Sequence, residues 1–316
     1  MRLAHDSVML ERAVDLWASS SARRVVDGTV GRAGHSLALL GRNDSVRLLA
    51  LDRDPQAVEF VERRFSGFDG RARVLHGSYA DLPLHLAAWG EGPVDGILLD
   101  LGVSSPQLDD ASRGFSTRAD APLDLRFDRA RGASAAEWLA DVDLDELTRV
   151  LAEYGEVPRP RRVARAILDA HASAPIETTG RLRQVVEGVA RRPGEPPAKA
   201  LARVFQAVRI AVNDELAHLD RFLAQLDQVL APGGRIVILS FHSLEDRRVK
   251  HAFREAARDC VCPPELPVCR CGGKRAWLRE LTRRPLTADA EELARNPRAR
   301  SARLRAAERI GEGAAS

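Results

Sequence analysis

Three aspartates in the first hundred residues each stand at the end of a short apolar segment, where a turn begins. They are Asp27 after RVV, Asp52 after VRLLAL and Asp100 after VDGILL. In open α/β sheets ligands bind outside the carboxyl ends of the strands, so an acid in this position is a candidate for binding or catalysis. Asp100 stands out because Gly102 and the polar run SSPQ follow it. The alternative, that Asp100 only caps a turn or helix, is equally compatible with this stretch alone.

Residues 27–34 (DGTVGRAG) form a glycine-containing loop between a predicted strand and a predicted helix. Glycine lets the backbone approach a ligand closely, and a helix N-terminus supplies free N–H donors. The spacing G-x-x-G-x-x-G is neither the dinucleotide fingerprint nor a phosphate-binding loop, which ends in Gly-Lys-Ser/Thr. Asp52 is placed to accept both hydroxyls of a ribose. Loop and acid together favour a nucleoside cofactor over the alternative, a turn without a ligand.

Strand and helix patterns alternate around these aspartates. The predicted strands are residues 24–27, 46–51, 73–76 and 94–100, and the predicted helices are 35–40, 55–65 and a short segment from 81. Short apolar runs bounded by glycine or aspartate are typical of buried strands. Strands separated by helices imply an α/β fold with a parallel, doubly wound sheet.

The pattern changes at about residue 108. Residues 108–132 are polar, and predicted helices follow at 134–151, 161–171, 179–189 and 198–204. A long helix over 205–230 then leads to a fifth strand at 235–240, a helix at 243–257, and closing strands at 277–281 and 302–306 around a helix near 288–295. We interpret this order as a sheet domain in two parts, residues 1–107 and 205–316, with a helical insertion at 108–204.

Composition and charge are those of a soluble globular protein. The 316 residues are 45% hydrophobic and 29% charged. No apolar run is long enough to cross a bilayer, and the N-terminus lacks the apolar core of a signal peptide, so we expect a cytoplasmic protein without a membrane partner. Residues 267–310 carry 12 Lys or Arg against 5 Asp or Glu. This basic end suggests a polyanionic partner, although an ordinary arginine-rich surface is the alternative. The arginines expected to contact a phosphate backbone are Arg279, Arg283, Arg284, Arg298, Arg300, Arg303 and Arg305.

Four cysteines lie within twelve residues, at Cys260, Cys262, Cys269 and Cys271. In a protein expected in the cytoplasm, such a group indicates metal binding rather than disulfides. The C-x-C spacing is tighter than the common C-x-x-C, which weakens the signal. Zinc or another soft metal, held as a structural clip, is our hypothesis.

Longer strings carry a resemblance to a known family. GRAGHS (31–36), LDRDPQA (51–57), DGILLDLGVSSPQLDDASRGFS (95–116), PLDLRFD (122–128), FQAVRIAVNDEL (205–216), PGGRIVILSFHSLEDRRVK (232–250) and NPRARSARLRAAER (296–309) occur in that order. The chain resembles the bacterial 16S ribosomal RNA cytosine-N4 methyltransferase family over essentially its whole length. The resemblance implies a class I methyltransferase sheet, an inserted helical domain for substrate recognition, S-adenosylmethionine as cofactor, and 16S rRNA within the small ribosomal subunit as partner.

The resemblance also implies roles for individual residues. The family's cofactor contacts fall on Ala33, Gly34, His35, Asp52, Tyr79, Asp100 and Gln107. Two of these depart from the family pattern, which has glycine at 33 and phenylalanine at 79. A methyl at 33 would lower cofactor affinity if φ is positive there. Tyr79 keeps an aromatic face for the adenine.

Methyl transfer to an exocyclic amine requires an acceptor for an amine N–H and alignment of nitrogen with the methyl group. Asp100 is the candidate catalytic residue, although its contact with the cofactor is the first expectation. Asn213, Ser240 and His242 are candidates for reading the base, and helix capping is the alternative for His242. Two rival functions stay open, a non-catalytic RNA-binding or assembly factor and a methyltransferase for DNA or protein.

Overall fold

A computed structural model describes residues 7–116, 119–190, 194–260, 262–263, 266, 268, 270–273 and 275–311. The chain divides into two compact units. The sheet unit comprises residues 1–102 and 217–316, and the helical unit comprises residues 103–216.

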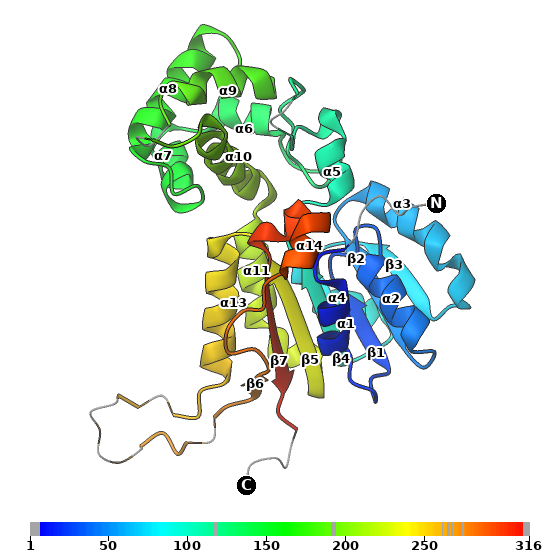
Figure 1. The fold of residues 1–316 in the computed structure, drawn as a ribbon. Coiled ribbons are helices and arrows are strands. Elements are labelled where there is room, and N and C mark those ends of the chain that lie inside the picture. Colours follow the sequence, from blue (N-terminus) through cyan, green and yellow to red (C-terminus); the bar gives the residue numbers. More distant parts are fainter. Residues whose placement is uncertain are drawn as a thin grey trace. The chain divides into compact units, whose positions relative to one another are not determined.

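The sheet unit is built on seven strands in the order β3-β2-β1-β4-β5-β7-β6 (Figure 1). The strands are β1 (Arg24–Asp27), β2 (Arg47–Asp52), β3 (Ala72–His76), β4 (Val94–Asp100), β5 (Leu230–Ser240), β6 (Leu278–Glu280) and β7 (Arg303–Arg309). The first five are parallel, and β7 runs antiparallel to both of its neighbours. The predicted parallel, doubly wound sheet is therefore confirmed. The strand order reverses at β1, and such a switch point is where open α/β sheets bind ligands.

Helices cover this sheet because both of its faces are apolar. They are α1 (Leu10–Trp17), α2 (Gly34–Arg42), α3 (Pro55–Phe65), α4 (Leu82–Trp89), α12 (Leu226–Val229), α13 (Ser243–Ala256) and α14 (Ala290–Arg295), with most of α11 (Glu215–Ala224). Along β2, Leu48 belongs to one core cluster and Leu49 to another, because successive strand residues point to opposite faces. Trp17 fills the first core and Phe222 the second. Burial of both faces explains why the strands are continuous apolar runs.

The helical unit packs α5 (Ser105–Asp109), α6 (Ala135–Asp141), α7 (Leu144–Glu153), α8 (Pro160–Ser173), α9 (Thr179–Glu187) and α10 (Pro197–Asn213) around a third core cluster. The predicted helix at 134–151 is two helices. Val142 is extended between them, and the Asp143 side chain caps α7 by accepting a hydrogen bond from the Glu146 N–H.

The predicted long helix at 205–230 is also interrupted. Asp214 adopts a left-handed conformation with φ of 51°, which ends α10 before α11 begins. Helix α10 starts at Pro197, and Ala207 and Val208 lie in the core of the helical unit. The boundary that we expected at 204/205 therefore lies after residue 216, and the one expected at 107/108 lies after residue 102. In the part of the chain that the structure describes, none of the helices has the length and apolar character to cross a bilayer.

Candidate active site

The carboxyl ends of β2, β1 and β4, which are neighbours in the sheet, bring Asp52, Asp27 and Asp100 to one edge. The loop after β1 is tied to both neighbouring strands. Asp52 Oδ2 accepts a hydrogen bond from Gly31 N at 2.8 Å, and Thr29 Oγ1 accepts one from Asp100 N at 2.6 Å. The three aspartates therefore surround one loop whose backbone is fixed by two of the strands.

Asp27 holds this loop in place by accepting hydrogen bonds from it. Its carboxylate accepts hydrogen bonds from Thr29 N at 3.2 Å and Ser36 Oγ at 2.6 Å, and the residue is 2% exposed. Burial raises the pKa of Asp27 to about 6, against the lowering effect of those two hydrogen bonds. Sequence reasoning missed Thr29 and Ser36, whose only signal was a hydroxyl residue within or next to the loop.

Close packing within the protein is enough to explain why residue 28 of the loop is glycine. A Cβ at Gly28 would lie 2.4 Å from Leu99 Cδ2 and 2.9 Å from Tyr79 Cβ. Gly28 is therefore required because the loop passes directly over β4 and the residue after β3. Ala33, by contrast, occupies the position before α2 with φ of 63° and ψ of 26°. The positive φ considered for Ala33 is present.

Asp52 is also held by backbone groups. Its Oδ1 accepts a hydrogen bond from Asp54 N at 2.9 Å, in addition to the bond from Gly31 N. Burial is the largest cause that raises its pKa to about 6. Each carboxylate oxygen has a second lone pair, so Asp52 retains the capacity to accept hydroxyl groups of a ligand.

Asp100 is the least satisfied of the three acids. Its Oδ1 is buried and has no hydrogen-bond partner among the described residues. Burial, reinforced by the negative charges of Asp27 and Glu245, raises the pKa of Asp100 to about 8. A buried, unpartnered carboxylate costs free energy, so this oxygen is a marker of function rather than of stability.

His35 does not neutralise Asp100. Its Nδ1 lies 3.9 Å from Asp100 Oδ2, while its Nε2 lies 3.1 Å from the carbonyl oxygen of Val8. A carbonyl only accepts, so Nε2 carries the proton and Nδ1 does not. Burial lowers the pKa of His35 to about 4, so the ring is neutral at physiological pH.

Tyr79 follows β3 in a short 3-10 turn, η2 (Tyr79–Asp81), and is 8% exposed. Its ring packs edge-to-face against Phe222 of α11, with ring centroids 5.7 Å apart and an interplanar angle of 86°. This contact fixes the orientation of the Tyr79 ring. Phe222 was not among the residues that the sequence singled out.

Two predicted site residues lie in the helical unit. Gln107 is the third residue of a capping box in α5, where its side-chain oxygen accepts a hydrogen bond from Ser104 N at 2.9 Å. Asn213 is 2% exposed and bonds to the backbone: it donates to Leu125 O at 2.7 Å and accepts from Phe127 N at 2.8 Å. The structure gives Asn213 a bracing role inside this unit, so its contact with the base stays a prediction.

The other two candidates for reading the base lie near the start of α13. Ser240 is 2% exposed, and its Oγ donates a hydrogen bond to the carbonyl of Arg303 at 3.3 Å. His242 is the N-cap residue of α13, and Glu245 completes the capping box by accepting from the His242 N–H at 3.3 Å. The capping role considered for His242 is therefore present, and its catalytic role is untested.

The basic C-terminal end is only partly available to a polyanion. Arg305 is 4% exposed, and its guanidinium is paired with Asp246, as is that of Arg303 at 3.0 Å. The expectation that Arg305 contacts phosphate is wrong, because its charge is neutralised inside the sheet unit. Arg279 pairs with Glu308 at 2.7 Å. Arg279 and Arg303 are exposed although they form these ion pairs, and Arg283, Arg284, Arg298 and Arg300 are exposed as well.

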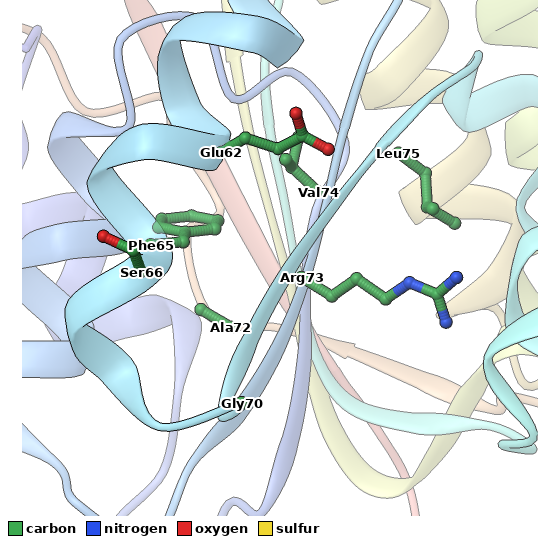
Figure 2. Close-up of a pocket in the computed structure, with 8 residues that line it drawn as sticks. All are labelled: Glu62, Phe65, Ser66, Gly70, Ala72, Arg73, Val74 and Leu75. Carbon is green, nitrogen blue, oxygen red and sulfur yellow. The ribbon is translucent and has the colours of Figure 1, made fainter.

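A pocket of about 390 Å³ lies between the end of α3 and the edge strand β3. Figure 2 shows the residues that line it. Its charged side chains are Glu62 and Arg73. The pocket runs along the strand and includes none of the three aspartates, so it is separate from the candidate active site.

The strand order, with an antiparallel β7 between β5 and β6, is that of the class I methyltransferase fold, and acids stand at the ends of β1, β2 and β4. The particular family follows from comparison with known sequences. Residues 2–310 match the model of the MraW methylase family, and the chain belongs to that family.

Curated relatives cover nearly the whole chain. A protein of Thermomicrobium roseum is 48% identical over 97% of this chain and 94% of its own length, and one of Geobacter sp. strain M21 is 45% identical over 97% and 98%. One of Nitratidesulfovibrio vulgaris is 45% identical over 98% of this chain and 87% of its own length. All three are named ribosomal RNA small subunit methyltransferase H.

Proposed function

We propose that this protein transfers a methyl group from S-adenosylmethionine to the exocyclic N4 amine of one cytidine in 16S rRNA of the small ribosomal subunit. The observation that carries the cofactor assignment is the group of Asp27, Asp52 and Asp100 at one sheet edge. In the described part of the chain, none of the three pairs with an arginine or lysine, and burial raises the pKa of each. A cationic ligand with hydroxyl groups would relieve both conditions.

The residues at this edge fit that cofactor. Asp52 would accept its ribose hydroxyls, and the Tyr79 ring would contact its adenine. The backbone N–H groups of Gly34 and His35, at the N-terminus of α2, would be donors to its carboxylate. Ala33 would lie beside them in the contact, but its own N–H donates to Val30 O at 2.6 Å. Asp100 would bind its ammonium group, close to the positive sulfur. Gln107 is assigned to the cofactor through the family resemblance alone.

S-adenosylmethionine supplies an electrophilic methyl group, and N4 of cytosine is the nucleophile. The N4 lone pair is delocalised into the ring, so a hydrogen-bond acceptor for its N–H and correct alignment account for much of the rate. Asp100 is the candidate for this second role because its buried Oδ1 has no partner among the described residues.

The two roles of Asp100 predict different kinetics. If Asp100 only binds the cofactor, Asp100→Asn raises KM for S-adenosylmethionine, and a saturating concentration restores kcat. If Asp100 also accepts the N4 hydrogen bond, kcat falls at saturating cofactor as well. Steady-state kinetics with small subunits from a strain that lacks this gene separate the two.

The assignment of an rRNA substrate rests on the family resemblance and on the names of the relatives. The exposed arginines Arg283, Arg284, Arg298 and Arg300 support it, because such groups contact a phosphate backbone in a salt-dependent manner. The helical unit is the proposed region for substrate recognition.

The deciding experiment is mass spectrometry of nucleosides and fragments of 16S rRNA from a deletion strain. We expect one cytosine to lose a methyl group on N4, and the wild-type gene to restore it. Cofactor binding without methyl transfer to small subunits would instead indicate an assembly factor. Transfer of labelled methyl groups to DNA or protein, with 16S rRNA unlabelled, would contradict the proposed substrate.

A further inference from the structure

The segment that joins α13 to β6 carries a cluster of thiols that methyl transfer does not use. Its base is closed by backbone hydrogen bonds, from Trp277 N to Ala256 O at 2.9 Å and from Arg275 N to Asp259 O at 3.3 Å. Of the four cysteines in this segment, Cys260, Cys262 and Cys271 are described by the structure, and Cys269 lies outside the described residues.

The three described sulfur atoms converge. The Sγ atoms of Cys260, Cys262 and Cys271 all lie within 4.8 Å of one another, although the residues are up to eleven positions apart in the chain. The tight C-x-C spacing does not prevent this convergence. The C-x-C spacing is therefore no argument against a metal site shared by these three sulfur atoms.

The distances suit a metal better than a disulfide. Cys260 Sγ and Cys271 Sγ lie 3.6 Å apart, whereas bonded sulfurs in a disulfide are separated by about 2.05 Å. In a tetrahedral zinc site with Zn–S bonds of about 2.3 Å, neighbouring sulfurs are separated by about 3.8 Å. The observed separation of Cys260 Sγ and Cys271 Sγ is therefore close to the sulfur–sulfur distance in a tetrahedral zinc–thiolate site.

A backbone group already supports one of these sulfurs. Arg270 N donates a hydrogen bond to Cys262 Sγ at 3.3 Å. N–H donors of this kind stabilise the thiolate, which is the form that binds a metal. All three cysteines are partly exposed, so an ion can reach them.

We propose that Cys260, Cys262 and Cys271 bind a structural zinc ion. Thiolates are soft ligands, and closed sites of several cysteines are typical of structural zinc in proteins. Each thiol loses a proton when the Zn–S bond forms, and no oxidant or reductant is required.

The site would organise a segment that has little core of its own. Leu266 and Val268 are 37% and 72% exposed, so these apolar residues contribute little burial. A metal crosslink between Cys260 and Cys271 would stabilise the segment in place of apolar burial, because it restricts the conformations of the unfolded chain. We expect its effect within residues 257–277, because neither core cluster of the sheet unit includes a cysteine; Trp277, at the end of the segment, packs against one of these clusters.

The test measures zinc in full-length protein that is purified without chelators or affinity metals, then reduced, exposed to Zn²⁺ and desalted. We expect one zinc per chain in the wild type and loss of bound zinc in Cys262→Ser and in the double variant Cys260→Ser/Cys271→Ser. Val268→Ser, an exposed neighbour without a ligand atom, is the matched control and should keep its zinc.

Cobalt substitution and hydrogen exchange give independent readouts. Wild-type protein with Co²⁺ should show thiolate-to-metal charge transfer and the strong visible bands of tetrahedral cobalt, and the serine variants should not. Zinc should slow amide exchange within residues 257–277 only. Binding of less than one equivalent of zinc by the reduced wild type, or unchanged binding in both serine variants, overturns the proposal. A Cys260–Cys271 disulfide in peptides from freshly lysed cells also overturns it.

Discussion

Asp100 in the sheet unit and Asp124 in the helical unit are both largely buried acids, but their surroundings differ. Asp124 accepts hydrogen bonds from Arg126 Nε at 2.8 Å and from Arg129 Nε at 3.0 Å, whereas Asp100 Oδ1 has no partner among the described residues. Although burial alone would raise the pKa of Asp124, the hydrogen bonds and charges of the arginines hold it below its usual value. Burial and two neighbouring carboxylates raise that of Asp100 to about 8.

The difference separates structural acids from functional ones. A buried carboxylate with matched donors holds a loop in place, as Asp124 does through Arg126 N at 3.1 Å. A buried carboxylate without them destabilises the unliganded protein and persists where a ligand supplies the missing charge. Replacing Asp100 and Asp124 in turn by asparagine tests this distinction.

The largest effect is expected for Asp100→Asn. The amide has the same size but no charge, so it cannot pair with the ammonium group of S-adenosylmethionine. Loss of a buried charge pair costs about 3 kcal/mol, so affinity should fall about 100-fold or more in calorimetry. The same variant should be at least as stable as the wild type at pH 8. Unchanged affinity would remove Asp100 from the site.

The stability part of that prediction has a definite pH dependence. The pKa of Asp100 is higher in the folded state, about 8, than the ordinary value of 3.8. The folded protein therefore binds this proton more tightly than the unfolded chain, and stability falls as pH rises from about 4 to about 8. Asp100→Asn removes this loss. Its melting temperature relative to that of the wild type should rise across the same pH range.

Cofactor affinity should depend on pH for the same reason. A cationic ligand binds the ionised carboxylate, so below the pKa of Asp100, about 8, each pH unit should lower wild-type affinity about tenfold. Protonation of Asp52 and Asp27, with pKa values of about 6, should steepen the decline at lower pH. In Asp100→Asn only the lower step should remain. Calorimetry from pH 5 to 9, in buffers of matched ionic strength, would show a flat profile if the acids do not contact the ligand.

Asp124→Asn should have the opposite effects to Asp100→Asn, because it should lower stability and leave cofactor affinity unchanged. It leaves Arg126 and Arg129 without their carboxylate, and because the Arg129 side chain is 46% exposed, we expect a loss of about 2 kcal/mol rather than the full cost of a broken buried pair. Since the pKa of Asp124 is lowered in the folded state, its contribution is present at neutral pH and disappears as pH falls below about 4. Urea unfolding should show the difference at pH 7 and little difference at pH 3, with cofactor affinity unchanged at pH 7.

The elements that carry the acids were predictable because their signals are local. Each of β1, β2 and β4 is a short apolar run that ends in aspartate, and Pro55 with the Asp54 cap marks the start of α3. That the acids meet at one edge then follows from the general rules for parallel sheets, whereas the strand order was not predicted. The resemblance to a methyltransferase family supplied the chemistry.

Partners distant in the chain explain what the sequence did not predict. Arg305 was expected at phosphate, yet it pairs with Asp246, 59 residues away. The bond of Asn213 to Leu125, 88 residues away, was likewise not predicted, and the expected contact of Asn213 with the base stays a prediction. A polar residue that braces a loop and one that binds a ligand have the same type and the same local sequence. The break at Asp214 likewise lacks the glycine or proline that usually ends a helix.

The smallest effect is expected at Ala33, where the family has glycine. Its positive φ costs about 1 kcal/mol for a residue with a Cβ, which glycine would relieve. Glycine would also lose a buried methyl group, worth about 0.8 kcal/mol, and add freedom to the unfolded chain, worth about 0.5 kcal/mol. These terms nearly cancel, so Ala33→Gly should leave stability almost unchanged in urea unfolding.

The side-chain burial of Ala33 also decides the effect on the cofactor. The residue is 0% exposed and belongs to the core cluster that includes Val8 and Leu40. Its methyl group therefore packs into the protein instead of facing the space between the aspartates. Although φ is positive at this position, Ala33→Gly should therefore not raise affinity for S-adenosylmethionine, contrary to the expectation from the sequence and in contrast to the effect of Asp100→Asn. A rise in affinity in calorimetry would show that the methyl group, or the backbone conformation that it imposes, weakens cofactor binding. Alanine in place of the family's glycine would then lower the affinity of the active site for S-adenosylmethionine.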